Sequence, residues 1–270
     1  MMSPLFESLI KNSLTVLADE PDDSTAMVWS EAEAEAEIEN SDKAIYKLDL
    51  VDKEVLMEDV EDLLAYDTIR KVKELWLDKN EFGNEGVEAL ANSSQLKQLL
   101  VLSLAHNKLT NYSAQSIAAS PFFGHLQKLF LQSNQIGLEG LKALTESEVL
   151  SNLQMLYLNL NPIGPAGAQL LAGESKLKNL RELYLQKTGL GLGGVKMLCE
   201  SKNFQQLTLL SIAANGLEDS AVDLLCRSEA FPRLITLDLY QNRISDHAVD
   251  QLKASPNLKS VRAFQVDWRG

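Results

Sequence analysis

Apolar residues recur along most of the chain at a fixed spacing of 27 residues. The first position of each unit is Ile45, Val72, Leu99, Leu126, Leu153, Leu180, Leu207 and Leu234, and Leu258 follows after 24 residues. Positions four and six are apolar as well, for example Leu129 and Leu131 in the unit that begins at Leu126. Apolar residues at alternate positions predict a short strand with one buried face.

A polar residue follows each predicted strand at position nine. It is Asn in six of the seven full units and Thr188 in the remaining one. An Asn side chain there can hydrogen-bond backbone groups that are left open where the chain turns away from the strand. Thr188 keeps a hydroxyl group, so we expect its unit to lose one hydrogen bond. The unit at Ile45 has Lys53 at this position, which indicates a degenerate repeat.

The second half of each unit predicts a helix. Positions sixteen and nineteen are both apolar, as Leu141 and Leu144 are, and this spacing places one buried stripe on a helix. Each unit is therefore expected to form a strand, a turn and a helix. Parallel strands stack about 4.8 Å apart whereas packed helices need about 10 Å, so stacked units must curve. We expect an α/β solenoid with an inner parallel sheet and outer helices.

Two stretches show the repeat most clearly: Leu126–Ile136 (LQKLFLQSNQI) and Leu153–Ile163 (LQMLYLNLNPI). Both fit LxxLxLxxNxL, so the sequence resembles the leucine-rich repeat family. The pattern GxxGxxxL in Gly137–Leu144 and Gly164–Leu171 resembles the ribonuclease-inhibitor-like subclass, and LANS in Leu90–Ser93 resembles its bacterial tandem members. The resemblance implies a curved horseshoe arc that serves as a binding scaffold, a role such repeats play for many unrelated partners.

The repeats divide the chain into three parts. Residues 1–44 are expected to be an acidic N-terminal helical cap, residues 45–257 to hold one degenerate and seven full repeats, and residues 258–270 to be a C-terminal cap strand. Within the cap, Met1–Leu17 carries a helical apolar stripe, and Thr25 to about Glu39 predicts a second helix. Alternating apolar residues are expected to close the last strand: Phe264, Val266 and Trp268.

The charge is unevenly distributed. The chain has 38 acidic and 25 basic residues, a net charge of −13, yet residues 1–70 alone hold 19 acidic and 5 basic residues. Glu occupies alternate positions in Ser30–Asn40, which is either a solvated face of the cap or a docking site for a basic partner. We expect no nucleic-acid partner, because phosphate recognition needs surplus Lys and Arg, and these are scarce among the strand-facing residues.

Membrane insertion and a secretory leader are not expected. Met1–Ala18 includes Glu7 and Lys11, which interrupt the apolar stretch that a signal peptide needs. No segment approaches the roughly 20 apolar residues that span a bilayer. We therefore expect a cytoplasmic protein without a membrane partner, and export without a cleavable signal stays open.

The sequence contains no pattern typical of catalysis. Cys199 and Cys226 are 27 residues apart, so they occupy equivalent places on neighbouring helices, about 10 Å apart and too far for a disulfide. Gly189–Gly194 (GLGLGG) lacks the Lys and Ser or Thr of a phosphate loop. The histidines lack metal-ligand spacing to one another or to Cys: His106, His125 and His247. We expect no enzyme activity, no cofactor and no metal.

Apolar residues also occupy strand positions that should face solvent. Positions three, five and seven point away from the core, yet they include a set that we take as the candidate protein-binding residues: Trp76, Phe130, Met155, Tyr157, Tyr184, Leu209 and Tyr240. Stacked aromatics can stabilise their own sheet. A contiguous apolar patch is also typical of a binding hot spot.

These observations predict a non-catalytic protein–protein interaction module that binds a protein or peptide on its concave aromatic face. Two alternatives stay open. The resembled subclass includes Ran GTPase-activating proteins, so the partner could be a GTPase, although no catalytic residue is carried over. The chain could also be an exported effector that binds a host protein.

Overall fold

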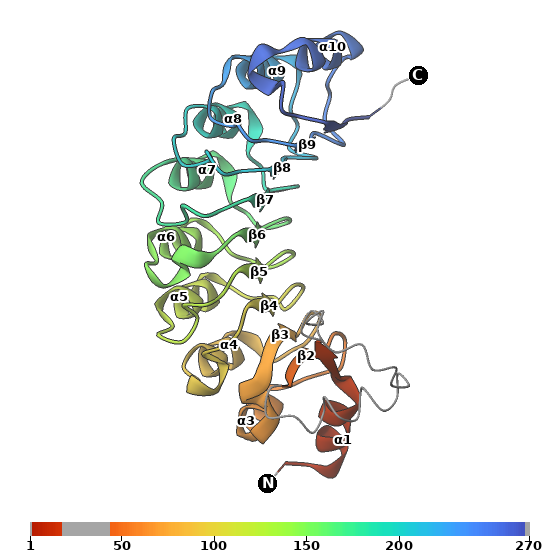
Figure 1. Cartoon of the computed structure of the whole chain (residues 1–270), viewed down its shortest axis with the longest axis vertical. Helices are drawn as coiled ribbons and strands as arrows, with labels where there is room; N and C mark the ends of the chain where they lie inside the picture. Colours follow the sequence, from red (N-terminus) through yellow and green to blue (C-terminus); the bar gives the residue numbers. More distant parts are fainter. Residues whose placement is uncertain (1, 18–43, 268–270) are drawn as a thin grey trace, which may run out of the picture.

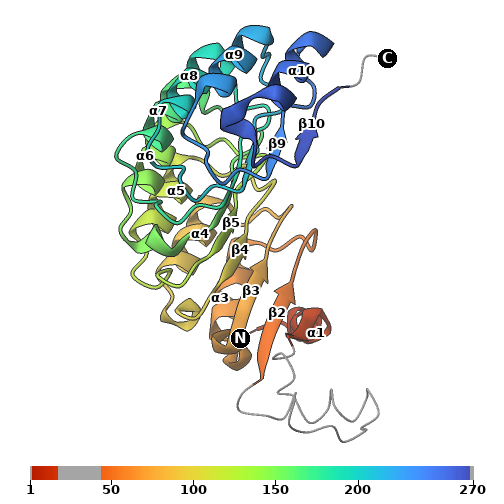
Figure 2. The same ribbon diagram turned by 45° about the horizontal axis from the view of Figure 1, so that its top comes forward.

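The repeating unit builds a curved solenoid. The computed structural model describes residues 2–17 and 44–267. Each unit contributes a strand to the inner side of the arc and, through a turn, a helix to its outer side (Figure 1). Turning the molecule shows the strands side by side in one continuous sheet with the helices stacked behind it (Figure 2). The predicted α/β leucine-rich-repeat solenoid is confirmed.

The strands follow one another in chain order across a single sheet. All neighbours are parallel except β1 and β2, which are antiparallel. The bounds are β1 Leu14–Leu17, β2 Ile45–Asp49, β3 Val72–Trp76, β4 Val101–Ser103, β5 Lys128–Phe130, β6 Met155–Tyr157, β7 Glu182–Tyr184, β8 Leu209–Ser211, β9 Thr236–Asp238 and β10 Ala263–Gln265.

The helices of the repeat units, α3 to α10, lie where the apolar pairs at positions sixteen and nineteen predicted them, and α1 belongs to the cap. Their bounds are α1 Pro4–Ser13, α3 Met57–Ala65, α4 Gly83–Ala91, α5 Asn111–Ala119, α6 Leu138–Glu146, α7 Gly164–Ala172, α8 Gly191–Cys199, α9 Asp219–Arg227 and α10 Asp246–Ala254. Short 3₁₀ turns lead into some of the strands: Asp67–Lys71, Ser94–Leu96, Val149–Asn152 and Pro256–Leu258.

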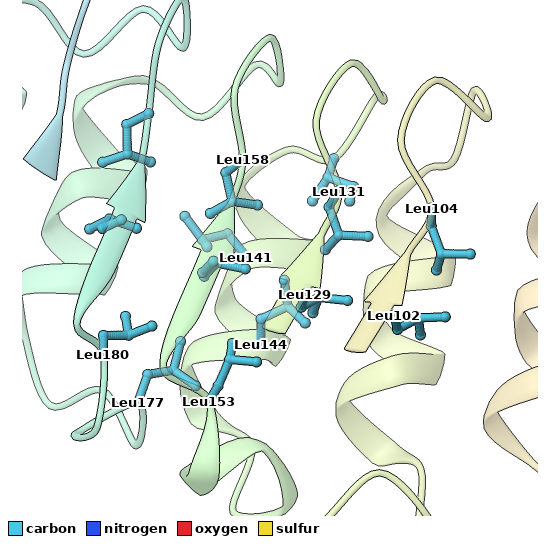
Figure 3. Close-up of a cluster of buried hydrophobic side chains, with 14 of the residues drawn as sticks. Leu102, Leu104, Leu129, Leu131, Leu141, Leu144, Leu153, Leu158, Leu177 and Leu180 are labelled. Carbon is cyan, nitrogen blue, oxygen red and sulfur yellow. The ribbon is translucent and has the colours of Figure 1, made fainter. Parts of the chain in front are cut away.

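The core is a column of leucines between sheet and helices (Figure 3). Leu129 and Leu131 of the β5 unit point toward Leu141 and Leu144 of α6, and all four side chains are fully buried. Burial of each such side chain contributes about 1.5–3 kcal/mol. Because every unit repeats these contacts with its neighbours, the core runs continuously along the arc.

The Asn side chains at position nine join each unit to the one before it. Asn134 Nδ2 donates to the carbonyl of Leu104 in the preceding unit and to that of Leu131 in its own, both at 3.0 Å. Its Oδ1 accepts from the backbone N–H groups of Asn107 (3.1 Å) and Leu109 (3.0 Å). Side-chain amides therefore satisfy buried backbone groups that the turn leaves without partners.

Thr188 loses more than the one hydrogen bond expected. Its Oγ1 donates to the Leu185 carbonyl of its own unit at 2.7 Å, but within residues 44–267 it makes none of the three side-chain bonds to the preceding unit that Asn134 makes. The Ile163 N–H instead donates to the Asn161 carbonyl at 2.9 Å. A hydroxyl is too short and has too few polar atoms to replace an amide here.

The residue at position eight adopts a left-handed backbone in every described unit up to β9. The φ angles lie between 52° and 59° at Asp52, Lys79, His106, Ser133, Leu160, Lys187, Ala214 and Gln241. This conformation disfavours L-residues. It aims the N–H at the next unit, as when Leu160 donates to the Gln186 carbonyl at 2.9 Å. The stack therefore imposes a conformation that these side chains do not favour.

The N-terminal cap combines a helix with a strand. The stripe predicted over residues 1–17 forms α1 only as far as Ser13, and its Phe6 and Ile10 are buried. Residues 14–17 form β1, which pairs along β2. An open strand edge leaves backbone groups unpaired, and β1 covers that edge. The predicted second helix, Thr25–Glu39, and the acidic run with its expected basic partner lie outside the described residues.

The last strand at the other end of the sheet is β10, Ala263–Gln265. Phe264 lies in β10, which pairs in parallel with β9. Phe264 and Val266 are partly buried against the core, whereas Trp268 lies outside the described residues.

Both cysteines are unpaired and belong to the outer helices. Burial raises the pKa of the Cys199 thiol to about 12, and burial also raises the pKa of Cys226. The backbone carbonyls of the two residues accept hydrogen bonds from Ser228 (2.7 Å) and Ser255 (3.0 Å), so both residues are fixed in the helix packing.

Alkylation tests this burial, since the thiolate is the reactive form. With iodoacetamide at pH 8 we expect Cys199 of the native protein to react on the order of 10³-fold more slowly than an ordinary cysteine, because a pKa near 12 leaves few thiolates. Mass spectrometry should show Cys226 labelled first. Equal rates for both cysteines in native protein would contradict the structure, and urea should make the rates equal.

Restoring the missing amide tests the Asn contacts. We expect Thr188→Asn to raise the free energy of unfolding by about 1–2 kcal/mol, since each new buried hydrogen bond contributes about 1 kcal/mol. Asn134→Ala should lower it by about 2–4 kcal/mol, because it leaves buried backbone groups unpaired. Thermal and urea melts measure both changes. A destabilising Thr188→Asn would mean that the turn at Ile163 cannot accept the amide.

Candidate functional site

Four aromatic side chains form a stack on the concave face, which we call the aromatic ladder: Trp76, Phe130, Tyr157 and Tyr184. Strand register places Phe130, Tyr157 and Tyr184 side by side on β5, β6 and β7. Ring centroids are 4.6 Å apart for the first pair and 3.8 Å for the second, with interplanar angles of 28° and 13°. The rings therefore present one continuous apolar surface.

Trp76 joins the ladder across an intervening strand. It lies on β3, two strands from Phe130, yet the ring centroids are only 5.2 Å apart. Ser103 on β4 occupies the position between them, and its hydroxyl bonds the Asp78 carboxylate. Two strand spacings are about 10 Å, so the small, tethered Ser103 gives the indole room to lean over β4.

Acidic side chains fix the ends of the ladder. The Tyr184 hydroxyl donates to Glu182 Oε2 at 2.9 Å, and Trp76 Nε1 donates to Glu74 Oε2 at 3.4 Å. Lys47 Nζ lies 4.9 Å from the centroid of the Trp76 ring, a cation–π distance. Burial raises the pKa of both Tyr157 and Tyr184, so both phenols stay neutral at physiological pH.

Unsatisfied acceptors gather beside the ladder. At position seven of the units that contain β5, β6 and β7, just past the end of each strand, lie three amides that we call the amide row: Gln132, Asn159 and Gln186. In the described part of the chain, the buried side-chain atoms without a hydrogen-bond partner are Gln132 Oε1, Ser133 Oγ, Asn159 Oδ1 and Gln186 Oε1. All four belong to the units that carry Phe130, Tyr157 and Tyr184. A buried acceptor without a partner costs about 1–3 kcal/mol.

Of the remaining candidate residues, Met155 and Leu209 border the ladder and Tyr240 lies apart from it. Met155 and Leu209 occupy position three on β6 and β8, with Glu182 between them in register. Both are half-buried and border the ladder. Tyr240 is 49% exposed and follows β9, so Ser211 and Asp238 separate it from Tyr184. The structure thus brings six of the seven residues to one surface and leaves Tyr240 outside it.

Sequence reasoning missed a polar cavity at the edge where the chain enters β5 to β8. Its volume is about 580 Å³, and it is lined by His125, Gln127, Asn152, Gln154, Lys178, Asn179, Arg181 and Gln206. These residues come from equivalent places just before the strands of successive units. A comparison of the same repeat positions from one unit to the next would have predicted that these residues lie together, whereas a search for motifs does not.

The residues that the structure describes include neither a membrane-spanning helix nor a metal-binding cluster. No helix there is long and apolar enough to cross a bilayer. Nor do three or more His, Cys, Asp or Glu side chains gather there in a way that could hold a metal ion.

Comparisons with known proteins agree with this architecture. Residues 68–91, 125–144 and 149–172 match the family model described as leucine-rich repeat. A search of curated proteins found no match. Two solved structures have a similar fold: an internalin from Listeria monocytogenes (TM-score 0.53, 21% identity) and a Bacteroides fragilis protein (TM-score 0.51, 15% identity).

The two alignments cover 78% and 77% of this chain. They cover 54% of the internalin and 68% of the Bacteroides protein, so the chain spans about half the length of the former. Three segments match the family model, and the same strand, turn and helix repeat along the whole arc. The chain therefore has a leucine-rich-repeat fold, and three of its segments match the leucine-rich repeat family model.

Proposed function

We propose that this protein is a non-catalytic interaction module that binds a protein or peptide on its concave face, over the aromatic ladder. The proposal rests on the fact that two unusual features lie at the same place in the structure. The stacked rings and the unsatisfied acceptors lie on the same three units, those of β5, β6 and β7. A bound peptide can cover the rings and donate N–H groups to the acceptors.

Sheet stabilisation alone does not explain both features. Cross-strand aromatic pairs contribute about 0.2–1 kcal/mol each, which accounts for stacking. The side-chain oxygens of Gln132, Asn159 and Gln186 have no hydrogen-bond partner among the described residues, and stacking of the rings does not account for that. A purely structural surface would gain nothing from them. Rotation of these flexible amides toward a ligand would recover the lost hydrogen bonds, so binding gives the amide row a role.

The rigidity of the ladder also favours binding. The rings are held by stacking and by the hydrogen bond from Tyr184 to Glu182, so few rotamers are lost when a partner covers them. Large aromatic side chains that are ordered in advance are typical anchors of interfaces.

We also infer that the repeats belong to the ribonuclease-inhibitor-like subclass, because each 27-residue unit has a full outer helix.

Random peptides displayed on phage test the proposal without knowledge of the partner. Peptides selected on the wild-type protein should bind Tyr157→Ala/Tyr184→Ala at least thirty-fold more weakly, since loss of a hot spot costs about 2 kcal/mol or more. Fluorescence anisotropy with the labelled peptides measures the affinity.

A matched control removes exposed apolar groups from the outer helices instead. Tyr112→Ala/Leu138→Ala truncates two exposed side chains on α5 and α6 and should leave peptide binding unchanged. Circular dichroism and thermal melts confirm that both double variants fold. The proposal fails if folded Tyr157→Ala/Tyr184→Ala binds the selected peptides as tightly as the wild type does.

A further inference from the structure

Cations line one edge of the inner sheet. The residues at positions 26 and 27 of each unit and at position two of the next lie where the chain enters a strand. Between Arg70 and Ile235 these are 21 residues, of which none is Asp or Glu. Seven are Lys or Arg, and we call them the basic edge: Arg70, Lys71, Lys73, Lys97, Lys178, Arg181 and Arg233. Residues 71–270 hold 20 basic and 19 acidic residues, so this column without acidic residues differs from the nearly neutral repeats around it.

The polar cavity lies in the middle of this edge. Lys178 and Arg181 line it together with His125, and no acidic residue is among the described residues that line it. Lys178 Nζ donates to Asn203 Oδ1 at 2.7 Å, a neutral acceptor that leaves the positive charge uncompensated. Arg181 and His125 are exposed. The cavity therefore offers positive charge and hydrogen-bond donors to an anion.

The cavity and the aromatic ladder lie a few residues apart along the chain. Arg181 precedes Tyr184 by three residues along the strand, as Gln154 precedes Tyr157. At about 3.3 Å per residue, the separation along the strand is about 10 Å. An extended segment spans the same distance with about three residues.

We propose that the segment bound on the concave face is acidic, with a carboxylate side chain in the cavity about three residues from an apolar side chain on the aromatic ladder. This inference rests on the proposed function. Guanidinium and ammonium groups form the strongest hydrogen bonds with carboxylates, and the cavity of about 580 Å³ has room for such a group.

A peptide fits this surface better than a nucleic acid does. The cavity lining includes amides that both donate and accept, such as Gln127 and Gln154, and they match the donors and acceptors of a peptide backbone. A phosphodiester backbone only accepts. Glu74 and Glu182 lie between the basic edge and the aromatic ladder, and their carboxylates would repel phosphates that cross toward the rings.

Two phage libraries test the inference: random 12-residue peptides, and the same library built without Asp and Glu. Binders from the complete library should be enriched in acidic residues and should bind at least ten-fold more tightly than any from the acid-free library. Their affinity should fall as the salt concentration rises. Lys178→Glu/Arg181→Glu should weaken binding at least ten-fold.

The control variant Lys142→Glu/Lys196→Glu makes the same change in net charge on the exposed faces of α6 and α8, and it should bind normally. The two libraries could give binders of equal affinity that still bind Lys178→Glu/Arg181→Glu but lose affinity for Tyr157→Ala/Tyr184→Ala. That result would overturn this inference and leave the proposed function standing. Tighter binding of a random 20-nucleotide RNA than of the selected peptides would also overturn it.

Discussion

The hydrogen bonds of the Asn side chains at position nine fix the register of the whole solenoid. Asn134 satisfies backbone groups of the Leu109 turn, which belongs to the preceding unit. A unit that slipped by one residue would leave them buried and unpaired. The bonds therefore align equivalent positions of successive units strand by strand. The leucine column supplies most of the stabilisation but would tolerate slippage better, because apolar contacts are not directional.

This register turns the sequence period into rows of side chains on the surface. Position five becomes the aromatic ladder, position seven the amide row, and the residues before each strand the basic edge. The backbone beneath each row is held in place because its strands are hydrogen-bonded on both sides. The three rows meet on β5 to β7, so a ligand there encounters an apolar surface, open acceptors and positive charge within a few residues.

The limits of sequence-based prediction follow from the same geometry. The strands were predictable because the alternation of apolar residues, as at Leu129 and Leu131, is a local signal. The helices were predictable from apolar residues three positions apart, such as Leu141 and Leu144. The effect of Thr188 was underestimated, because an Asn bonds the unit before it and those partners are far away in sequence. The stacking of Phe130, Tyr157 and Tyr184 was predictable from the period, whereas the approach of Trp76 across Ser103 was not.

The 27-residue period alone specified the fold class, the rows of equivalent residues and the direction of curvature, since each of these needs only the spacing of apolar residues and the widths of strands and helices. Three features depended on contacts between units. Residues 14–17 became a strand because β2 had an open edge. Leu160 took a left-handed backbone because its N–H reaches the next unit. The cavity of His125 and Arg181 formed because the entries of successive strands lie side by side, which a repeat read one unit at a time does not show.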